Sequence, residues 1–311
     1  MPGRGAKTGS GGVSRVLVTG GAGFIGCHLV RRLLSDGNEV IVLDNFYRST
    51  PAALGDLSDR VEVVEGDIRD RETLRRTFRG VETVYHLAAQ SNVLGALTDI
   101  DYSFSTNVIG TFEVLSAAEA SGVQRVVYTS SREVYGEAQA LPVWEDAPLN
   151  AKNAYGASKL AGELYCRVFA SRGLQTAVLR LANVYGPGDR DRVIPLFLDA
   201  AKAGKPLRLY GGGQVLDLIR VDVVVEALAR AGDGRPVPVP VNVGSGRGTT
   251  VRELAQRVLG LTGSASLLDV QPARSFETSA FVAGVRRCEE VLGLRVEQDD
   301  PLSLLPQMAA G

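Results

Sequence analysis

A tyrosine and a lysine one helical turn apart are the residues best placed to do chemistry in this 311-residue chain. Tyr155 and Lys159 open a segment with helical periodicity, so their side chains lie on one helix face. The lysine ammonium can stabilise a phenolate and lower the tyrosine pKa from about 10, which makes the tyrosine a usable general base near neutral pH. Ser130 and Ser131 place hydroxyl groups at the end of a predicted strand that begins near Val126. These residues predict acid/base chemistry.

A glycine-rich turn is the second chemical feature. Gly20, Gly23 and Gly26 join a predicted strand, which begins at Val16, to a helical pattern from His28 onward. The first glycine allows a sharp turn, the second a close approach of backbone N–H groups to a pyrophosphate, and the third close packing of the helix on the sheet. Because the helix N-terminus would face the anion, the turn predicts a dinucleotide-binding site.

A carboxylate at the end of the next predicted strand indicates which dinucleotide binds. The apolar run Val40–Leu43 ends at Asp44, about 20 residues past the glycine-rich turn, where a carboxylate can accept both hydrogen bonds of an adenosine ribose diol. A 2′-phosphate at that position would meet a negative charge. We therefore expect NAD rather than NADP, and the nearby Arg48 is the residue that argues against this choice.

The elements that must position these residues alternate along the first part of the chain. Short apolar runs predict strands, and the segments between them have the periodicity of helices. This alternation predicts an α/β fold of the Rossmann type, a doubly wound parallel sheet with the cofactor at the carboxyl ends of the strands. Further strands are predicted at 61–64, 83–87, 125–129 and 176–179, and helices at 71–78, 105–121 and 155–171.

Beyond Arg180 the chain changes to shorter pieces interrupted by Gly and Pro, which predicts a smaller α/β domain for the substrate. Helices are predicted there at 221–231, 251–261 and 285–292. We expect a flexible tail at 1–13, a NAD-binding Rossmann domain at 14–181 together with about 219–245, and a substrate domain at 182–218 together with 246–311.

Composition argues against several other classes of protein. Lys and Arg number 34 against 35 Asp and Glu, so no positive field favours nucleic acid or an anionic membrane. No apolar run reaches the roughly 20 residues of a membrane span, and we expect a cytoplasmic protein. We expect Cys27, Cys166 and Cys288 to be buried free thiols and His28 and His86 to be structural residues, so no metal site is predicted.

These motifs together resemble those of the extended short-chain dehydrogenases/reductases, specifically the nucleotide-sugar epimerase/dehydratase group that includes UDP-glucose 4-epimerase. The resemblance extends from Val16 over nearly all of the remaining chain, and it is more specific for the family than for the reaction. The motifs that carry it are Thr19–Gly26, Asp44–Asn45, Gly66–Ile68, His86–Ala89, Asn107, Ser130–Ser131 with Val134–Gly136, Tyr155 with Lys159, and Arg180–Pro187.

The resemblance implies a role for each matching residue. Tyr155 would be the acid/base on a sugar hydroxyl, Ser131 would relay a hydrogen bond to that hydroxyl, and Lys159 would hold the nicotinamide ribose. The residues implied to bind the cofactor are Gly20, Gly23, Phe24, Ile25, Gly26, Asp44, Asn45, Asp67, Ile68, Leu87, Ala88, Ala89, Tyr155 and Lys159. Those assigned to the UDP-sugar substrate are Gln90, Ser130, Ser131, Asn183, Arg192 and Arg274.

The reaction implied is 4-epimerisation of a nucleotide sugar through a transient 4-keto intermediate, with a homodimer formed through helices around 105–121 and 155–171. Related 4,6-dehydratases carry an Asp-Glu pair, and related UDP-glucuronate decarboxylases a Ser-Glu pair, where this chain has Arg132 and Glu133. Both residues are therefore candidate catalytic groups, and decarboxylation and dehydration stay open as alternatives. A non-catalytic NAD-binding sensor is the alternative of another class.

Several arginines distinguish this chain within the group. Arg132, Arg190, Arg192 and Arg220 occur where a neutral sugar would not require them, and one of them could bind a substrate carboxylate bidentately. This makes the conversion of UDP-glucuronate to UDP-galacturonate a hypothesis beside that of UDP-glucose. The family usually has a diphosphate-binding arginine where this chain has Leu216, and Arg274 matches the family's other one.

Overall fold

A seven-stranded parallel sheet forms the centre of the molecule. The computed structural model describes residues 13–296 and 300–310, so the predicted tail, except for Val13, lies outside the described residues. The strand order is β10-β6-β5-β4-β1-β2-β3, and every pair is parallel. The strands are β1 (Arg15–Thr19), β2 (Glu39–Asp44), β3 (Glu62–Glu65), β4 (Thr83–His86), β5 (Arg125–Ser131), β6 (Gln175–Leu181) and β10 (Val241–Val243). The order reverses between β1 and β4, so the predicted doubly wound Rossmann fold is confirmed.

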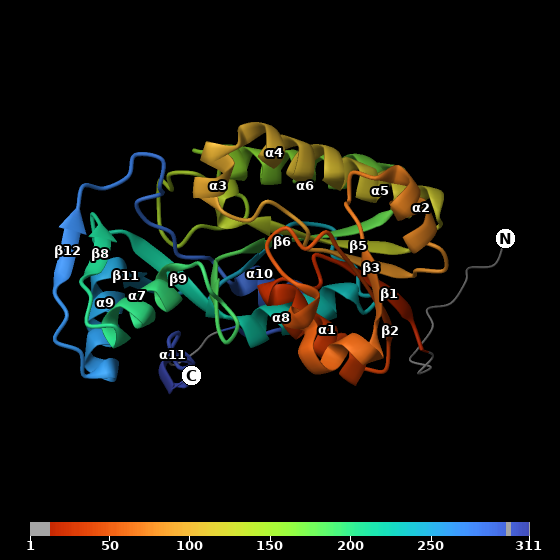
Figure 1. The fold of residues 1–311 in the computed structure, drawn as a ribbon. Coiled ribbons are helices and arrows are strands. Elements are labelled where there is room, and N and C mark those ends of the chain that lie inside the picture. The colour runs from red at the N-terminus through yellow and green to blue at the C-terminus, as the bar shows by residue number, and fades with distance from the viewer. Residues whose placement is uncertain (1–12, 297–299, 311) are drawn as a thin grey trace.

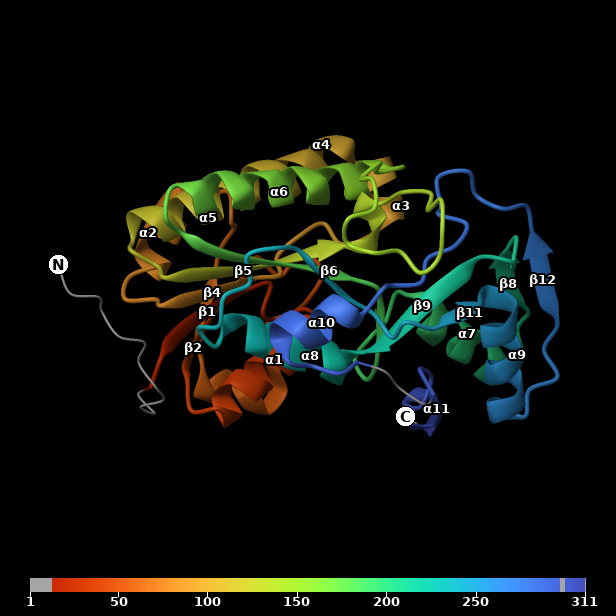
Figure 2. The same ribbon diagram turned by 180° about the vertical axis from the view of Figure 1, so that it is seen from behind.

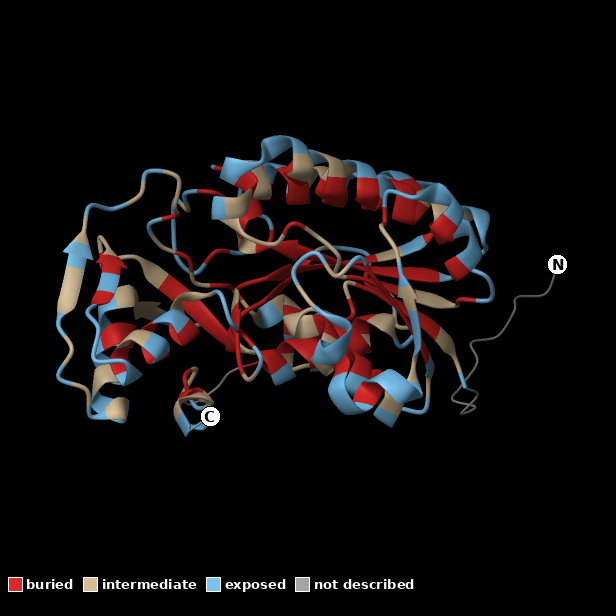
Figure 3. Ribbon diagram, in the orientation of Figure 1, coloured by how far each residue is buried: buried red, intermediate tan, exposed pale blue. Residues whose placement is uncertain are grey.

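Helices cover both faces of this sheet because the strands are rich in branched apolar residues that need burial on two sides. One layer holds α2 (Arg71–Thr77), α5 (Thr111–Ala120) and α6 (Ala154–Ser171), and the opposite layer holds α1 (Phe24–Ser35), α8 (Val221–Gly232) and α10 (Arg286–Leu292) (Figures 1 and 2). The buried residues of these helices face the sheet in Figure 3.

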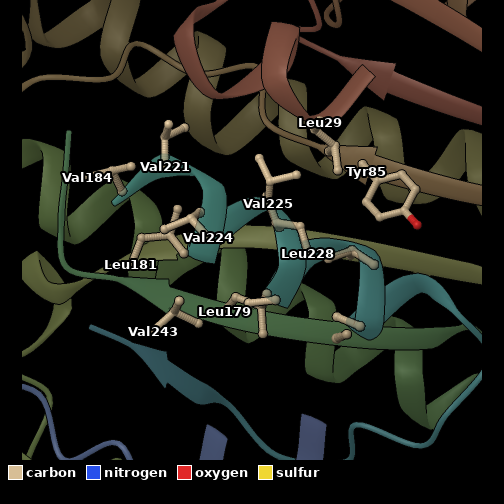
Figure 4. Packing of buried hydrophobic residues seen from close by; sticks show 14 of the residues in the cluster. Leu29, Tyr85, Leu179, Leu181, Val184, Val221, Val224, Val225, Leu228 and Val243 are labelled. Atoms are coloured by element: carbon tan, nitrogen blue, oxygen red, sulfur yellow. The ribbon is translucent and has the colours of Figure 1, made fainter. Parts of the chain in front are cut away.

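The core under α8 shows how the second layer is held. Val224 and Leu228 lie on the buried face of α8 and belong to the same apolar cluster as Leu179 of β6 and Val243 of β10 (Figure 4). All four side chains are fully buried. Burial of such a side chain stabilises the fold by about 1.5–3 kcal/mol, so this cluster fixes the carboxyl end of β6 where the site begins.

A smaller unit packs beside the carboxyl ends of the strands (Figure 1). Its core joins Leu198, Leu207, Leu254 and Val258, all of which are buried. It contains one sheet of order β11-β9-β7 and another of order β12-β8. Its elements are β7 (Asn183–Tyr185), α7 (Val193–Lys202), β8 (Leu207–Tyr210), β9 (Val215–Arg220), β11 (Gly248–Thr250), α9 (Val251–Thr262), β12 (Leu268–Gln271) and α11 (Leu305–Ala310).

The predicted helix over 105–121 is interrupted in the structure. A π-helical turn, Ser105–Gly110, precedes α5 and follows the short helices α3 (Val93–Thr98) and α4 (Ile100–Phe104). The buried Asn107 gives the reason, because its amide oxygen accepts a hydrogen bond from Gln90 N at 2.7 Å and its amide nitrogen donates to Gln90 O at 3.0 Å. Hydrophobic periodicity cannot reveal this π-helical turn, because the residue that causes it, Gln90, lies in the loop after β4.

The cysteines, one segment with unpredicted structure, and the possible membrane or metal sites are the remaining features of the fold. Cys27 is partly exposed, whereas Cys166 and Cys288 are buried free thiols as predicted. The segment 51–60 forms two short 3₁₀ turns, separated by a kink at Gly55, that the sequence did not predict. Within the described ranges, no helix is long and apolar enough to cross a membrane, and no group of His, Cys, Asp and Glu gathers as metal ligands do.

Candidate active site

A cavity of about 620 Å³ opens at the carboxyl ends of β1, β2, β4 and β5 and extends to the chain that follows β7. This is the edge at which ligands bind doubly wound sheets. Most predicted site residues line it, namely Gly20, Gly23, Phe24, Ile25, Gly26, Asp44, Asn45, Ile68, Leu87, Ala88, Ala89, Ser130, Ser131, Arg132, Glu133, Tyr155, Lys159, Asn183 and Arg192. Asp67, Gln90, Arg220 and Arg274 are not among its lining residues.

The glycine-rich turn has the shape that a dinucleotide diphosphate requires. Gly20 has a φ of 72°, and a Cβ atom on Gly26 would lie 2.3 Å from the Gly20 carbonyl oxygen. Helix α1 begins after Gly23 with no side-chain cap and no acidic residue in its first turn. Its first N–H groups are therefore available to an anion, and the residues present fit the group that the turn predicts.

Asp44 is fixed at the end of β2 for a ribose. Its carboxylate accepts hydrogen bonds from Ala22 N at 3.0 Å and from Phe46 N at 2.9 Å. The Arg48 guanidinium donates instead to Ser91 and Asp191, so it does not neutralise Asp44. A 2′-phosphate would meet an uncompensated carboxylate here, which favours NAD.

Asp67 does not line the cavity but contacts a residue that does. It accepts a hydrogen bond from Asn45 Nδ2 at 2.9 Å, and Asn45 lines the cavity. Hydrogen bonds from the Arg69 guanidinium lower the Asp67 pKa to about 2, so the carboxylate is ionised near neutral pH. Asp67 therefore orients Asn45 instead of lining the cavity itself.

The acid/base residues come together from two elements. Ser131 ends β5, and Tyr155 lies in the first turn of α6. The Asn153 side-chain oxygen caps the N-terminus of this helix by accepting a hydrogen bond from Gly156 N at 2.9 Å. Ser131 lies close enough to Tyr155 to favour its ionised form, which lowers the Tyr155 pKa. Lys159 Nζ lies 6.0 Å from the centre of the Tyr155 ring and donates to the Thr129 carbonyl at 2.9 Å.

The expected lowering of the tyrosine pKa by Lys159 is wrong for this structure. Enclosure by the protein raises the Tyr155 pKa to about 12, and this effect outweighs the opposing influence of Arg192, Ser131 and Arg132. Burial also lowers the Lys159 pKa to about 8. The low dielectric of the site penalises both charged forms, an effect that helical spacing does not reveal.

Glu133 is a buried and paired carboxylate. One of its oxygens lies 2.8 Å from an Arg132 guanidinium nitrogen, and the other accepts a hydrogen bond from Asn153 Nδ2 at 2.8 Å. Both Arg132 and Glu133 line the cavity. The negative charge is therefore compensated, and the pair presents a polar but nearly neutral wall to a ligand.

A buried network that the sequence analysis did not predict lies beneath the site. Glu163, one turn after Lys159 on α6, forms a two-pronged ion pair with Arg180 of β6 at 2.9 and 2.7 Å. The Ser130 hydroxyl donates to Glu163 at 2.5 Å, so this residue, predicted to bind substrate, is engaged within the protein. The local sign of this network in the sequence is that Glu163 falls on the buried face of α6.

The predicted substrate-binding residues divide into two groups. Asn183 lines the cavity with a buried amide oxygen that has no hydrogen-bond partner, as a residue awaiting a ligand would. Arg192 also lines it, 2.8 Å from Asp189. Gln90 is buried and does not line the cavity. Arg274 lies outside the cavity, and its guanidinium is 3.5 Å from the centre of the Tyr210 ring.

Arg190 differs from the other cavity arginines. Arg48, Arg132 and Arg192 form ion pairs with Asp191, Glu133 and Asp189. Arg190 is exposed at the cavity, and its guanidinium forms no hydrogen bond or ion pair with any residue that the structure describes. It is therefore the cavity arginine whose charge is most available to a ligand.

The order of the parallel strands, the glycine-rich turn and the Asp44 carboxylate that faces the expected ribose site together define a dinucleotide-binding protein of the Rossmann class. The model of the NAD dependent epimerase/dehydratase family matches residues 16–244. The chain belongs to this family and is an NAD-dependent enzyme of the epimerase/dehydratase type.

Individual relatives differ in the reaction that their names state. A UDP-glucose 4-epimerase of Mycolicibacterium smegmatis is 37% identical over 90% of this chain and 92% of its own. A UDP-N-acetyl-alpha-D-glucosaminuronate decarboxylase of Bacillus cytotoxicus is 34% identical over 81% of both chains. A dTDP-glucose 4,6-dehydratase of Mycobacterium tuberculosis is 35% identical over 67% of this chain and 65% of its own.

Solved structures show the same fold over almost the full length. UDP-glucose 4-epimerase of Thermotoga maritima with UDP-glucose superposes with a TM-score of 0.90 at 32% identity, over 95% of this chain and 97% of its own. MoeE5 in complex with UDP-glucuronic acid and NAD gives a TM-score of 0.86 at 33% identity, over 95% and 98%. Neighbours of this fold thus bind both neutral and acidic UDP-sugars.

Proposed function

We propose that the protein is a UDP-sugar 4-epimerase that acts on a UDP-hexose or a UDP-hexuronate. The observation that carries this proposal is that Tyr155, Ser131 and Lys159 line the same cavity as the glycine cradle. These groups can move a proton at a sugar hydroxyl. A second acid or base for elimination is lacking at Arg132, and Glu133 is held by Arg132 and Asn153, which disfavours dehydration.

The chain's own residues would divide the work as follows. Tyr155 exchanges a proton with the C4 hydroxyl, and Ser131, beside it in the cavity, orients that hydroxyl. Lys159 is positioned by the Thr129 carbonyl to hold the nicotinamide ribose. NAD, held by the glycine cradle and Asp44, would supply reversible hydride transfer at C4 when bound. Asn183 offers its unpartnered amide oxygen to the substrate.

The extra arginines support an acidic sugar as substrate. The Arg190 guanidinium has no partner among the described residues, and a guanidinium can bind a carboxylate through two parallel hydrogen bonds. The fold neighbour MoeE5 holds UDP-glucuronic acid and shares the fold over 95% of this chain. We infer that UDP-glucuronate, converted to UDP-galacturonate, is a substrate beside or in place of UDP-glucose.

The decisive experiment is an NMR time course of the protein with NAD and UDP-glucuronate, run beside UDP-glucose. The galacto product from the uronate is the expected result. Loss of the carboxylate as carbon dioxide would instead support a decarboxylase, the reading favoured by Glu133 and by the decarboxylase relative. A C5–C6 elimination product would support a 4,6-dehydratase. NAD binding without turnover of any nucleotide sugar would support a non-catalytic sensor.

Arg190→Ala should reduce the preference for the uronate over the hexose about tenfold or more, because a lost charge-assisted hydrogen bond is worth roughly 1.5–3 kcal/mol. The ratio of kcat/KM for the two sugars measures this effect. Arg220→Ala is the matched control, since Arg220 lies outside the cavity and pairs with Asp222. If Arg190→Ala, Arg132→Ala and Arg192→Ala all leave the ratio unchanged, the protein does not recognise a uronate through these arginines.

Two structural assignments complete the proposal. We assign residues 14–181 with about 219–245 to the NAD-binding domain and residues 182–218 with 246–311 to the nucleotide-sugar-binding domain, because α8 and β10 return to the large sheet. Helix α10 is the exception within 246–311, since Cys288 and Leu292 pack into the core of the large sheet. Arg274 remains our candidate residue for binding the diphosphate of the UDP-sugar. It would have to leave Glu277, 3.0 Å away, to reach a ligand in the cavity.

We also propose a homodimer formed through the layer of α4, α5 and α6. Large apolar side chains are exposed along this outer layer, including Ile100, Phe104, Phe112, Leu164 and Val168. Such a contiguous set marks an interaction surface. Leu164→Glu with Val168→Glu should convert the dimer to a monomer in light scattering after gel filtration. Leu196→Glu on α7, equally exposed, should not. A monomeric unmodified protein would contradict the proposal.

A further inference from the structure

The segment Asn45–Ser49, called the strap below, forms part of the wall of the cofactor cavity. It follows β2 directly, and four of its five residues line the cavity, all except Phe46. Its base is fastened to Asp44, whose carboxylate accepts hydrogen bonds from Phe46 N at 2.9 Å and Ser49 Oγ at 3.2 Å. The residue expected to hold the adenosine ribose therefore also holds the strap.

Two neighbouring side chains pin the strap to different parts of the molecule. The Tyr47 ring packs against Tyr102 of α4, with ring centres 4.8 Å apart. The Arg48 guanidinium lies 2.6 Å from Asp191 and donates to Ser91 Oγ at 3.0 Å. Asp191 belongs to the chain between β7 and α7, and Ser91 to the chain after β4. The strap thus joins three walls of one cavity.

The contacts of Tyr47 and Arg48 lie outside the apolar core, whereas Phe46 packs against it. Arg48 and Asp191 have side chains that are 34% and 69% exposed, so water and salt weaken their attraction. Phe46 has a φ of 54° and is, within residues 13–296 and 300–310, the only non-glycine residue with a positive φ. This conformation is unfavourable for a bulky residue, and it persists only while its surroundings impose it.

We propose that the strap retains the bound dinucleotide, with Tyr47 and Arg48 as its two fastenings. A closed strap spans the cavity between the ribose site at Asp44 and the chain that follows β7. Release of the cofactor would require the Arg48–Asp191 pair and the Tyr47–Tyr102 contact to separate. The inference rests on NAD binding, which the family shares, and not on the proposed epimerisation.

The test measures how fast NADH leaves the protein, by stopped-flow fluorescence after NADH-loaded protein is mixed with excess NAD. Arg48→Ala and Asp191→Ala should each speed release about threefold to fivefold, the upper range for an exposed ion pair. The double variant should release NADH no faster than either single variant. Tyr47→Ala should act separately and add to them. Release from the unmodified protein should accelerate with salt, and release from the double variant should not.

Arg172→Ala is the matched control, because it breaks another exposed ion pair, with Glu119, outside the cavity. It should leave the release rate unchanged. Faster release from Arg48→Ala with no change from Asp191→Ala would overturn the strap, because Arg48 would then act by contacting the cofactor itself. Unchanged release from all three strap variants would overturn it as well. Neither outcome affects the proposed reaction, since no sugar is present.

Discussion

Replacing Tyr155 by Phe should reduce turnover of the nucleotide sugar by about 10²–10⁴-fold, the contribution of a positioned acid/base group. In the proposed reaction the Tyr155 hydroxyl exchanges a proton with the sugar, and Ser131 lies beside it in the cavity. The phenylalanine ring fills the same volume, so the walls of the cavity should keep their shape. The rate of product formation by NMR measures the effect.

The same variant should bind NAD almost as tightly as the unmodified protein, because the glycine cradle and Asp44 are untouched. Isothermal titration with NAD checks this control. Ser131→Ala should lower the rate by a smaller factor, since Tyr155 keeps its place on α6. A Tyr155→Phe protein that turns over the sugar at the original rate would refute the assigned role.

Replacing Glu163 by Ala should lower the free energy of unfolding by about 3–5 kcal/mol, the range for removing one partner of a buried ion pair. Glu163 and Arg180 are each only 3% exposed at the side chain. Without Glu163 the guanidinium would stay buried near Tyr135 and the Glu145 carbonyl, which accepts a hydrogen bond from it but carries no charge. Urea denaturation followed by circular dichroism measures the loss.

An exposed pair provides the comparison for this stability change. Arg172→Ala, which removes a partner of Glu119 at the surface, should cost less than about 1 kcal/mol. Replacing both Glu163 and Arg180 by Leu should recover part of the stability that either single change loses, because no lone charge stays buried. Equal losses for Glu163→Ala and Arg172→Ala would show that the buried pair does not stabilise the fold as argued.

Local rules explain why much of the fold and site was predictable. The strand order follows from alternating apolar runs and helical patterns, since parallel strands need a crossover between them. The glycine turn and Asp44 are also local, because steric freedom and strand ends are properties of a few adjacent residues. Helix α6 and its Tyr155–Lys159 spacing match the prediction for the same reason.

Other features depend on contacts between distant parts of the chain. The π-helical turn exists because Asn107 binds the backbone of Gln90, and the pKa of Tyr155 is set by enclosure more than by Lys159. Gln90 was expected to contact the substrate, yet it is buried and does not line the cavity. None of these outcomes follows from periodicity, because each depends on which segments the fold brings together.

The sequence by itself determined the sheet, the dinucleotide turn and the preference for NAD, and it predicted the acid/base residues, since these follow from residue type and short spacing. Only the tertiary structure decided how the charges pair. Arg132 is bound to Glu133, Arg48 to Asp191 and Arg180 to Glu163, and the last two pairs join segments far apart in the chain. Electrostatic interactions depend on distance and burial, so the charge left free at Arg190 becomes visible only once the chain has folded.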